Sequence, residues 1–130
     1  MFTKDELKRF FDVCDNLKYK AMFMTVYGGG LRASSELVNL RIQDIDSKNM
    51  RILVREGKEK KYRYTLLSQT NLEVLREYYL KYKPTHPENY LFLAVKTESH
   101  FSISGLEIAF RKIKKKAGIT RKVTVHRIKT

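Results

Sequence analysis

Residues 40–67 read LRIQDIDSKNMRILVREGKEKKYRYTLL, and this stretch decides the class of fold. Its first run alternates apolar and polar residues, and the next two runs are rich in β-branched, aromatic and aliphatic side chains, as strands are. The interruptions Ser-Lys-Asn and Glu-Gly-Lys-Glu have the composition of tight turns. We therefore predict a small antiparallel sheet with strands at residues 40–46, 50–54 and 62–67.

Helical spacing of apolar residues precedes this stretch. Thr3 and Glu6 have the spacing of a capping box, so a helix begins there. A second apolar helix, over residues 19–27, ends in three glycines that permit positive φ and a sharp turn. We predict a short third helix over residues 31–40, capped by Ser34 or Ser35.

Two further helices follow the sheet. Ser68 is the expected cap of a long helix that ends before Pro84, and the last helix spans residues 102–117 and stops at Gly118. The predicted core faces carry Leu72, Leu75, Tyr78, Tyr79 and Tyr82 in one helix, and Leu106, Ile108, Ala109, Phe110 and Ile113 in the other. The expected fold class is α+β, mainly α, with helices around a small three-stranded antiparallel sheet, and residues 1–130 form one domain or most of one.

The charge of the chain is strongly basic and unevenly distributed. Lys and Arg number 27 against 14 Asp and Glu, which gives a net charge of +13. Residues 1–50 contribute 8 − 7 = +1, whereas residues 99–130 contribute 9 − 1 = +8. Such a gradient favours a polyanionic partner, above all a nucleic acid, although charge alone does not separate DNA from RNA or from a membrane headgroup.

Other classes of protein are disfavoured by simpler features. No apolar run is long enough to cross a bilayer, and the acidic residues near Met1 are unlike a signal peptide, so we expect a cytoplasmic protein without a membrane partner. Cys14 has no Cys or His companions at metal spacing and fits a small core residue. We therefore expect neither a metal nor another cofactor.

Three motifs carry candidate chemistry, and each has a plain structural alternative. The stretch YGGGLR over residues 27–32 presents Arg32 either to a phosphate or to an ion pair with Glu36. The tip GKEKKYR over residues 57–63 places Lys58 to donate a proton to a substrate, or it is a solvated turn. The segment TVHRIKT over residues 124–130 makes His126 and Lys129 a phosphate-binding pair, or the start of a helix.

Taken together, these motifs resemble tyrosine recombinases of the phage integrase family. The order Gly-x-Gly-Leu-Arg, then Asp-Ile-Asp, then Gly-Lys-x-x-Lys-x-Arg, then Val-Thr-x-His follows the catalytic domain of that family along essentially the whole chain. The resemblance identifies Arg32 with the first catalytic arginine, Lys58 with the hairpin lysine and His126 with the histidine of the His-x-x-Arg motif. The family cuts one DNA strand by attack of a tyrosine hydroxyl, which leaves a 3′-phosphotyrosyl link and a free 5′-hydroxyl, without a metal.

The family chemistry explains the residue types. Two arginine forks can clamp the non-bridging oxygens of the pentacoordinate transition state, and a lysine can protonate the departing 5′-oxygen. By the resemblance, the catalytic residues are Arg32, Lys58, His126 and Lys129, with Glu36 in support. We expect DNA contacts from further basic residues, namely Lys60, Lys61, Arg63, Arg111, Lys115, Lys122 and Arg127.

The chain departs from the family pattern at three places. Glu36 lies four residues after Arg32 instead of three, and Lys129 replaces the second arginine, which removes bidentate clamping. Removing such a clamp costs about 10²–10³ in rate by analogy with oxyanion donors. The chain also ends at Thr130, before the family's second histidine and nucleophilic tyrosine, and the family's N-terminal core-binding domain is missing.

The first functional hypothesis is therefore a DNA-binding fragment of a recombinase catalytic domain, inactive alone, whose partners are double-stranded DNA and further recombinase protomers. A non-catalytic DNA-binding module or degenerate integrase would use the same basic surface. A basic RNA-binding protein, in which aromatic side chains stack on bases, is the third hypothesis and would require exposed aromatics among the basic residues.

Overall fold

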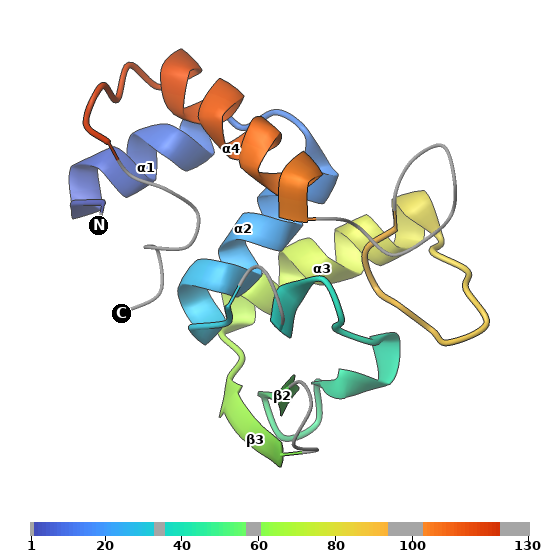
Figure 1. Ribbon diagram of the computed structural model, residues 1–130. Coiled ribbons are helices and arrows are strands. Elements are labelled where there is room, and N and C mark those ends of the chain that lie inside the picture. The colour runs from blue at the N-terminus through green and yellow to red at the C-terminus, as the bar shows by residue number, and fades with distance from the viewer. Residues whose placement is uncertain (1, 33–35, 57–60, 94–102, 123–130) are drawn as a thin grey trace.

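The computed structural model describes residues 2–32, 36–56, 61–93 and 103–122. Helices α1 (Lys4–Val13) and α2 (Leu17–Gly29) precede a 3₁₀ turn η2 (Ile42–Asp44) and the strands β1 (Ile45–Asp46), β2 (Arg51–Glu56) and β3 (Lys61–Leu66). Helices α3 (Gln69–Tyr82) and α4 (Ile103–Lys116) follow. The sheet lies at one end of the molecule, α1 and α4 lie at the other, and α2 runs between them (Figure 1).

The predicted helix ends at Thr3, Ser68 and the glycines after residue 27 are confirmed. The Thr3 hydroxyl accepts the Glu6 N–H at 3.1 Å while the Glu6 carboxylate accepts the Thr3 N–H at 2.9 Å, which completes the capping box. Ser68 accepts the N–H of Asn71 at 3.1 Å and begins α3. Gly30 ends α2 in the left-handed region at φ 65°.

The sheet is antiparallel with strand order β1-β2-β3, as predicted, but its first strand is much shorter than expected. Within residues 40–46 only Ile45 and Asp46 pair with β2, and Ile42–Asp44 form the 3₁₀ turn η2. The cause is local: the Asp44 carboxylate accepts the Arg41 N–H at 3.0 Å and caps a turn. Arg41 forms an isolated antiparallel β-bridge with Tyr90 and does not pair with β2. The prediction of a strand over residues 40–46 is therefore wrong at its start.

The predicted helix over residues 31–40 is only partly testable. The N–H groups of Glu36 and Leu37 both donate to the Arg32 carbonyl at 2.9 Å, which is the bonding of a helical turn. Ser34 and Ser35, the predicted caps, lie outside the described residues.

The core is built around aromatic rings from three helices. The ring centroid of Phe10 in α1 lies 5.4 Å from the ring centroids of both Phe23 in α2 and Phe110 in α4. Leu106 and Ala109 are buried as predicted, whereas Ile108 is 47% exposed and does not belong to the core face of α4. Burial of this apolar area supplies the driving force that holds the helices together.

The core face of α3 also differs from the prediction. Leu72, Leu75 and Tyr78 are buried as predicted, and the Tyr78 hydroxyl donates to the Leu91 carbonyl at 2.7 Å. Tyr79 and Tyr82 are 45% and 39% exposed, so their assignment to the core is wrong. Tyr78 continues the i, i+3 row from Leu72 and Leu75, whereas Tyr79 lies beside that row.

Candidate functional site

The end of α2 presents Arg32 at the surface. Gly29 is buried there, and a Cβ on it would lie 2.7 Å from Leu31 Cδ1. The hydroxyl of Thr65 in β3 donates to the Gly29 carbonyl at 2.7 Å, so the sheet docks directly on the helix end. Arg32 follows two residues after Gly30 and is exposed, as a residue that reaches a ligand must be.

A buried carboxylate holds the main chain at Arg32. Glu36 Oε1 accepts the Arg32 N–H at 2.6 Å and lies 3.2 Å from Arg63 Nη2 of β3. The Glu36 side chain is 3% exposed, and the same Arg63 nitrogen also donates to the Gly30 carbonyl at 3.4 Å. Glu36 thus joins the loop that carries Arg32 to the β2–β3 hairpin, and it supports Arg32 through the main chain.

A second buried carboxylate holds the other strand of the hairpin. Asp44 accepts from Arg55 at 3.1 Å (Nε) and 2.9 Å (Nη2), and the Asp44 side chain is 1% exposed. Such a forked pair fixes both the position and the direction of a guanidinium. Arg55 lies on β2 and Arg63 on β3, so a carboxylate anchors each of the two strands that flank Lys58 in the sequence.

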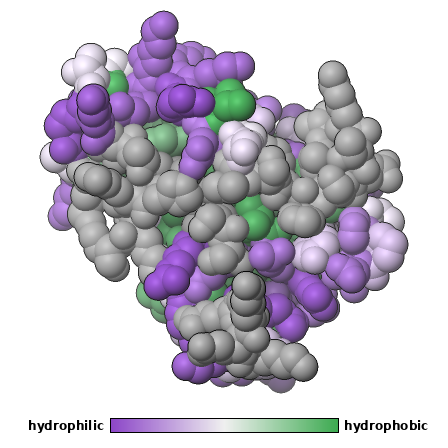
Figure 2. Space-filling view, viewed as in Figure 1, coloured by the Kyte–Doolittle hydropathy of each residue, from purple (hydrophilic) through white to green (hydrophobic). Residues whose placement is uncertain are grey.

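Basic side chains cover the outside of α4 and the segment after it. Arg111, Lys112, Lys115, Lys116 and Lys122 are all exposed, and hydrophilic side chains cover the end of the molecule formed by α1 and α4 (Figure 2). This surface combines high positive charge with a rigid helix, which suits contact with a phosphate backbone.

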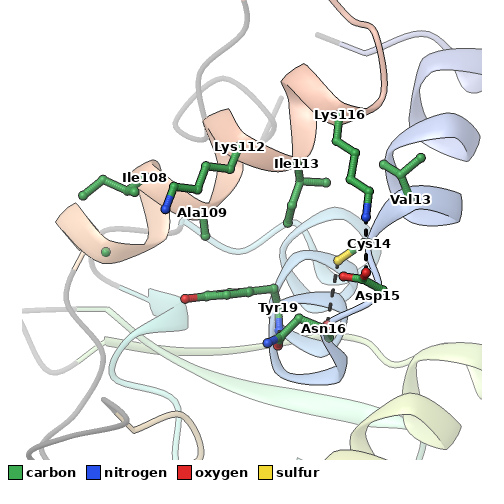
Figure 3. A pocket seen from close by; sticks show the side chains of 11 residues that line it. Val13, Cys14, Asp15, Asn16, Tyr19, Ile108, Ala109, Lys112, Ile113 and Lys116 are labelled. Atoms are coloured by element: carbon green, nitrogen blue, oxygen red, sulfur yellow. Dashed lines mark hydrogen bonds and ion pairs between the residues drawn. The ribbon is translucent and has the colours of Figure 1, made fainter.

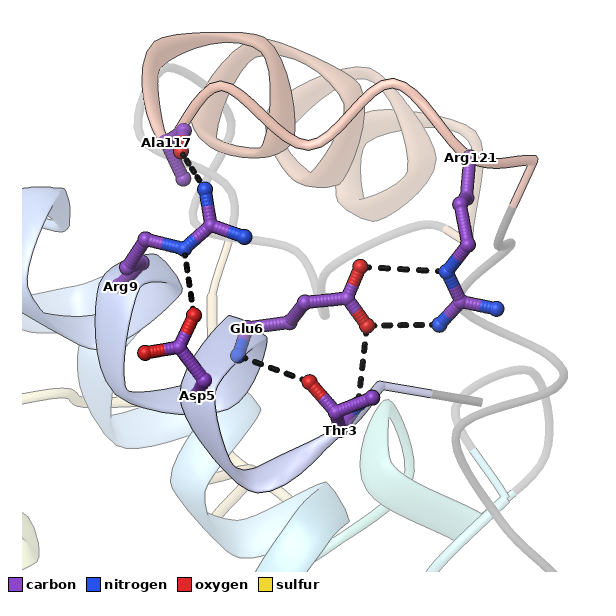
Figure 4. Close-up of polar contacts among 6 residues, drawn as sticks. All are labelled: Thr3, Asp5, Glu6, Arg9, Ala117 and Arg121. Atoms are coloured by element: carbon purple, nitrogen blue, oxygen red, sulfur yellow. Dashed lines mark hydrogen bonds and ion pairs between the residues drawn. The ribbon is translucent and has the colours of Figure 1, made fainter.

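The segment that leads from α4 toward His126 is tied to α1. Arg121 donates to Glu6 at 3.1 Å (Nε to Oε2) and 2.6 Å (Nη2 to Oε1), and Arg9 Nη1 donates to the Ala117 carbonyl at 3.3 Å (Figure 4). The side-chain hydrogen bond from Arg121 is the main cause that lowers the pKa of Glu6 to about 2. The capping box of α1 therefore also fixes the chain next to the predicted catalytic segment.

The structure describes only some of the predicted site residues. Arg32, Glu36, Lys61, Arg63, Arg111, Lys115 and Lys122 are described, and Arg63 is half-buried against Glu36. Outside the described residues lie Lys58, Lys60, His126, Arg127 and Lys129. Convergence of Arg32, Lys58 and His126 on one phosphate therefore stays a prediction.

Sequence reasoning predicted a supporting role for Glu36 but missed the other supporting residues. It predicted a strand at Asp44 and assigned no role to Arg55 or Arg121. The pairing of Arg121 with Glu6 joins positions 115 residues apart, and no local pattern marks it. The Asp-Ile-Asp motif, one of those that carry the family resemblance, was the usable signal for Asp44.

Two tyrosines, the half-buried Tyr27 and the buried Tyr78, are poorly suited to nucleophilic attack. Burial raises the pKa of Tyr27 and of Tyr78, which is the opposite of what an attacking phenolate needs. The Tyr64 ring lies under the Arg51 guanidinium, at 3.8 Å from its centroid, on the sheet face that points away from Gly29.

A groove of about 420 Å³ lies between α4 and the α1–α2 turn, apart from these residues (Figure 3). Cys14, Tyr19, Ala109 and Ile113 line it, and Lys116 pairs with Asp15 across its edge at 3.2 Å. Burial raises the pKa of the Cys14 thiol, which keeps it protonated and unreactive. The groove contains none of the predicted site residues.

Neither a metal-binding cluster nor a membrane-spanning helix is present among the described residues. No group of three or more His, Cys, Asp or Glu side chains in them is placed to hold a metal ion. In the same ranges, no helix has the length and apolar character that a membrane span requires.

The fold and the site define a family. The sequence matches the model of the phage integrase family over residues 1–130, and the chain belongs to that family. It is 34% identical over 129 residues to the tyrosine recombinase XerA of Pyrococcus horikoshii, a match that covers 98% of this chain and 44% of XerA.

Solved structures agree with the assignment. The crystal structure of XerA recombinase superposes with a TM-score of 0.87 at 31% identity, over 98% of this chain and 46% of that one. XerH recombinase, in a pre-cleavage complex with its difH substrate, shares the fold with a TM-score of 0.83 at 23% identity, over 98% of this chain and 40% of XerH. The chain thus spans less than half the length of these relatives.

Proposed function

We propose that residues 1–130 bind double-stranded DNA as part of the catalytic domain of a site-specific tyrosine recombinase. The observation that carries this proposal is the buried Glu36 carboxylate, which fixes the main chain of exposed Arg32 and ties it to the β2–β3 hairpin. A single phosphate binder on a loop would not need such a connection, whereas a site shared between Arg32 and a hairpin lysine requires it. XerH, which was solved with its DNA substrate, has the same fold.

In this proposal the side chains surround one scissile phosphate. Arg32 and His126 hydrogen-bond the non-bridging oxygens, Lys129 adds charge without a fork, and Lys58 protonates the departing 5′-oxygen. The attacking tyrosine is not among the eight tyrosines of residues 1–130. These residues by themselves therefore hold DNA and organise a phosphate but do not cut, and the protein works in the cytoplasm alongside further recombinase protomers.

The basic surface positions the DNA. Arg111, Lys115 and Lys122 contact the phosphate backbone along and beyond α4, and Lys60, Lys61 and Arg127 contact it near the site. Arg63, which pairs with Glu36, is a further residue of this DNA-contacting set. Contacts of this type fix register on the duplex without reading sequence.

The salt dependence of duplex binding tests the proposal. We expect the affinity for a fluorescent duplex, measured by anisotropy, to fall steeply with salt, with a logarithmic slope of about 0.9 for each phosphate that the protein neutralises. The K115Q/K122Q variant should bind more weakly and show a slope smaller by about 1 to 2.

The control is R76Q/K81Q, which removes two positive charges from the exposed side of α3 and leaves the total charge equal to that of the test variant. Equal effects of the two variants would mean that only net charge matters. A flat salt response of the wild-type chain would exclude nucleic-acid binding of any kind.

The same system separates a catalytic-domain fragment from a non-catalytic DNA-binding module. In the fragment, R32A should weaken binding to a duplex that carries the scissile phosphate more than binding to the same duplex with a neutral methylphosphonate there. Equal weakening on both duplexes would favour the non-catalytic module.

A further inference from the structure

The sheet has a second face that none of the predicted site residues Arg32, Glu36 or Arg63 uses. Residues opposite each other in an antiparallel pair point to the same side. The β2–β3 register pairs Arg55 with Tyr62, Leu53 with Tyr64 and Arg51 with Leu66. These six residues form what we name the outer sheet face, while Ile52 and Val54 point inward and are buried.

Two parallel rows of side chains cross the outer sheet face. In one row Asp46 accepts from Arg51 at 3.0 Å, and the Arg51 guanidinium lies 3.8 Å from the centroid of the Tyr64 ring. In the other, Asp44 holds Arg55, which lies 5.6 Å from the centroid of the Tyr62 ring. Each tyrosine is thus held by a guanidinium that a carboxylate orients in turn, which fixes the rings before any ligand arrives.

The two rings are open to solvent although they are held in place. Tyr62 is 57% exposed, Tyr64 is 55% exposed and the adjacent Leu66 is 70% exposed. They stand two residues apart on β3, one of the two edge strands of the sheet, so about 7 Å separates them along the strand. Large exposed rings in a fixed row are a binding feature, because ordinary packing would cover them.

The charge around the rings indicates the kind of partner. The described residues of 45–56 and 61–66 carry five Lys and Arg against two Asp and Glu, and the Asp44 carboxylate that orients Arg55 is only 1% exposed. A ligand that approaches this face therefore meets aromatic rings and guanidinium edges. That combination fits a polyanion with planar faces, whereas bases inside a duplex are already stacked and expose no such face.

We propose that the outer sheet face binds unpaired bases of single-stranded DNA, with Tyr62 and Tyr64 as stacking platforms. This extends the proposed function and rests on it in one respect: a strand-exchanging enzyme produces DNA ends whose bases are transiently unpaired. The duplex-binding surface on α4 and the outer sheet face are then two separate contacts with nucleic acid.

Anisotropy with a labelled oligothymidylate tests this inference, with the duplex assay run in parallel. The Y62A/Y64A variant should bind oligothymidylate at least about tenfold more weakly, because stacking on each ring contributes substantially to affinity. Its duplex affinity should change less than about twofold. Y62F/Y64F keeps both rings and should bind like the wild type, and Y79A, which removes an exposed ring from α3, should have no effect.

Several outcomes would overturn the inference. Unchanged oligothymidylate affinity of Y62A/Y64A would remove the stacking role, and tighter binding of oligouridylate than of oligothymidylate would make the ligand RNA. If Y62A/Y64A lost self-association in analytical sedimentation but still bound oligothymidylate, the outer sheet face would be a protein interface and not a DNA site. Failure of duplex binding with oligothymidylate binding retained would refute the proposed function and leave this surface standing.

Discussion

Asp44 and Asp46 make the same type of contact in very different surroundings. Each carboxylate receives an arginine of β2, but the Asp44 side chain is 1% exposed and the Asp46 side chain is 28% exposed. Water and salt screen the Asp46–Arg51 pair. In the Asp44–Arg55 pair, the contact between the two ions replaces hydration that burial has removed from them. The contribution of an ion pair to stability at this sheet therefore depends on how deeply its carboxylate is buried.

Asp44→Asn should lower the free energy of unfolding by about 3 kcal/mol, because it leaves the Arg55 guanidinium without its counter-charge. Asp46→Asn is the matched control and should cost at most about 1 kcal/mol. Urea denaturation of the two variants measures both values. Equal losses would show that burial does not separate the two pairs.

At the level of elements, the three glycines that end α2 are needed to different degrees. Gly28 is exposed in the last turn of the helix, Gly29 is buried against Leu31 and the sheet, and Gly30 has φ 65°. A Cβ on Gly28 meets only Asn71 Nδ2, at 3.8 Å, which is an ordinary contact. Only Gly29 and Gly30 therefore have a structural requirement for glycine.

Alanine at each of the three positions should give three different results. Gly28→Ala should stabilise the protein by about 0.5–1 kcal/mol through helix propensity. Gly30→Ala should cost about 1–2 kcal/mol, because its left-handed backbone disfavours a Cβ.

Gly29→Ala should cost about 1–3 kcal/mol through crowding of the core. Thermal unfolding of the three variants is the measurement. A loss at Gly28 as large as that at Gly29 would mean that the end of α2 packs differently from the structure.

Across the whole molecule, the first helix is linked to the last described segment. Glu6 belongs to the capping box of α1 and also pairs with Arg121, and Arg9 reaches the Ala117 carbonyl (Figure 4). These contacts close the molecule at the end opposite the sheet. They hold the chain that continues toward His126 against the body of the protein.

This closure should be sensitive to acid. The folded pKa of Glu6 is about 2, below the ordinary 4.5, so its ionised form stabilises the fold above about pH 4.5. As the pH falls from 4.5 toward 2, the unfolded chain takes up the proton first and that stability is lost.

The urea midpoint of the wild type should therefore drop across this range, and E6Q should drop less. R121Q serves as the control, because it removes the partner and should flatten the profile in the same way. A profile in E6Q as steep as that of the wild type would assign the acid sensitivity to other carboxylates.

The local parts of the site were predictable from sequence, and the connections between them were not. Spacing located the caps at Thr3 and Ser68, and the family resemblance marked Arg32 and Glu36. The prediction of a strand over residues 40–46 failed because an alternating pattern reflects side-chain polarity and does not show which main-chain groups find hydrogen-bond partners. The Arg41 N–H donates to the Asp44 carboxylate and the Ile42 N–H donates to the Asn89 carbonyl, so the chain turns there and does not continue as a strand.

The sequence by itself determined the helices α1 to α4 and the existence of the sheet, because these depend on nearby residues and their periodicity. Composition and motif order along the chain determined the basic character and the family. The tertiary structure alone decided that Glu36 meets Arg63, 27 residues away, and that Glu6 meets Arg121, 115 residues away. It also decided that Tyr62 and Tyr64 stay exposed while Tyr78 is buried. Burial and pairing over such separations follow from how the elements pack, and packing is a property of the folded chain.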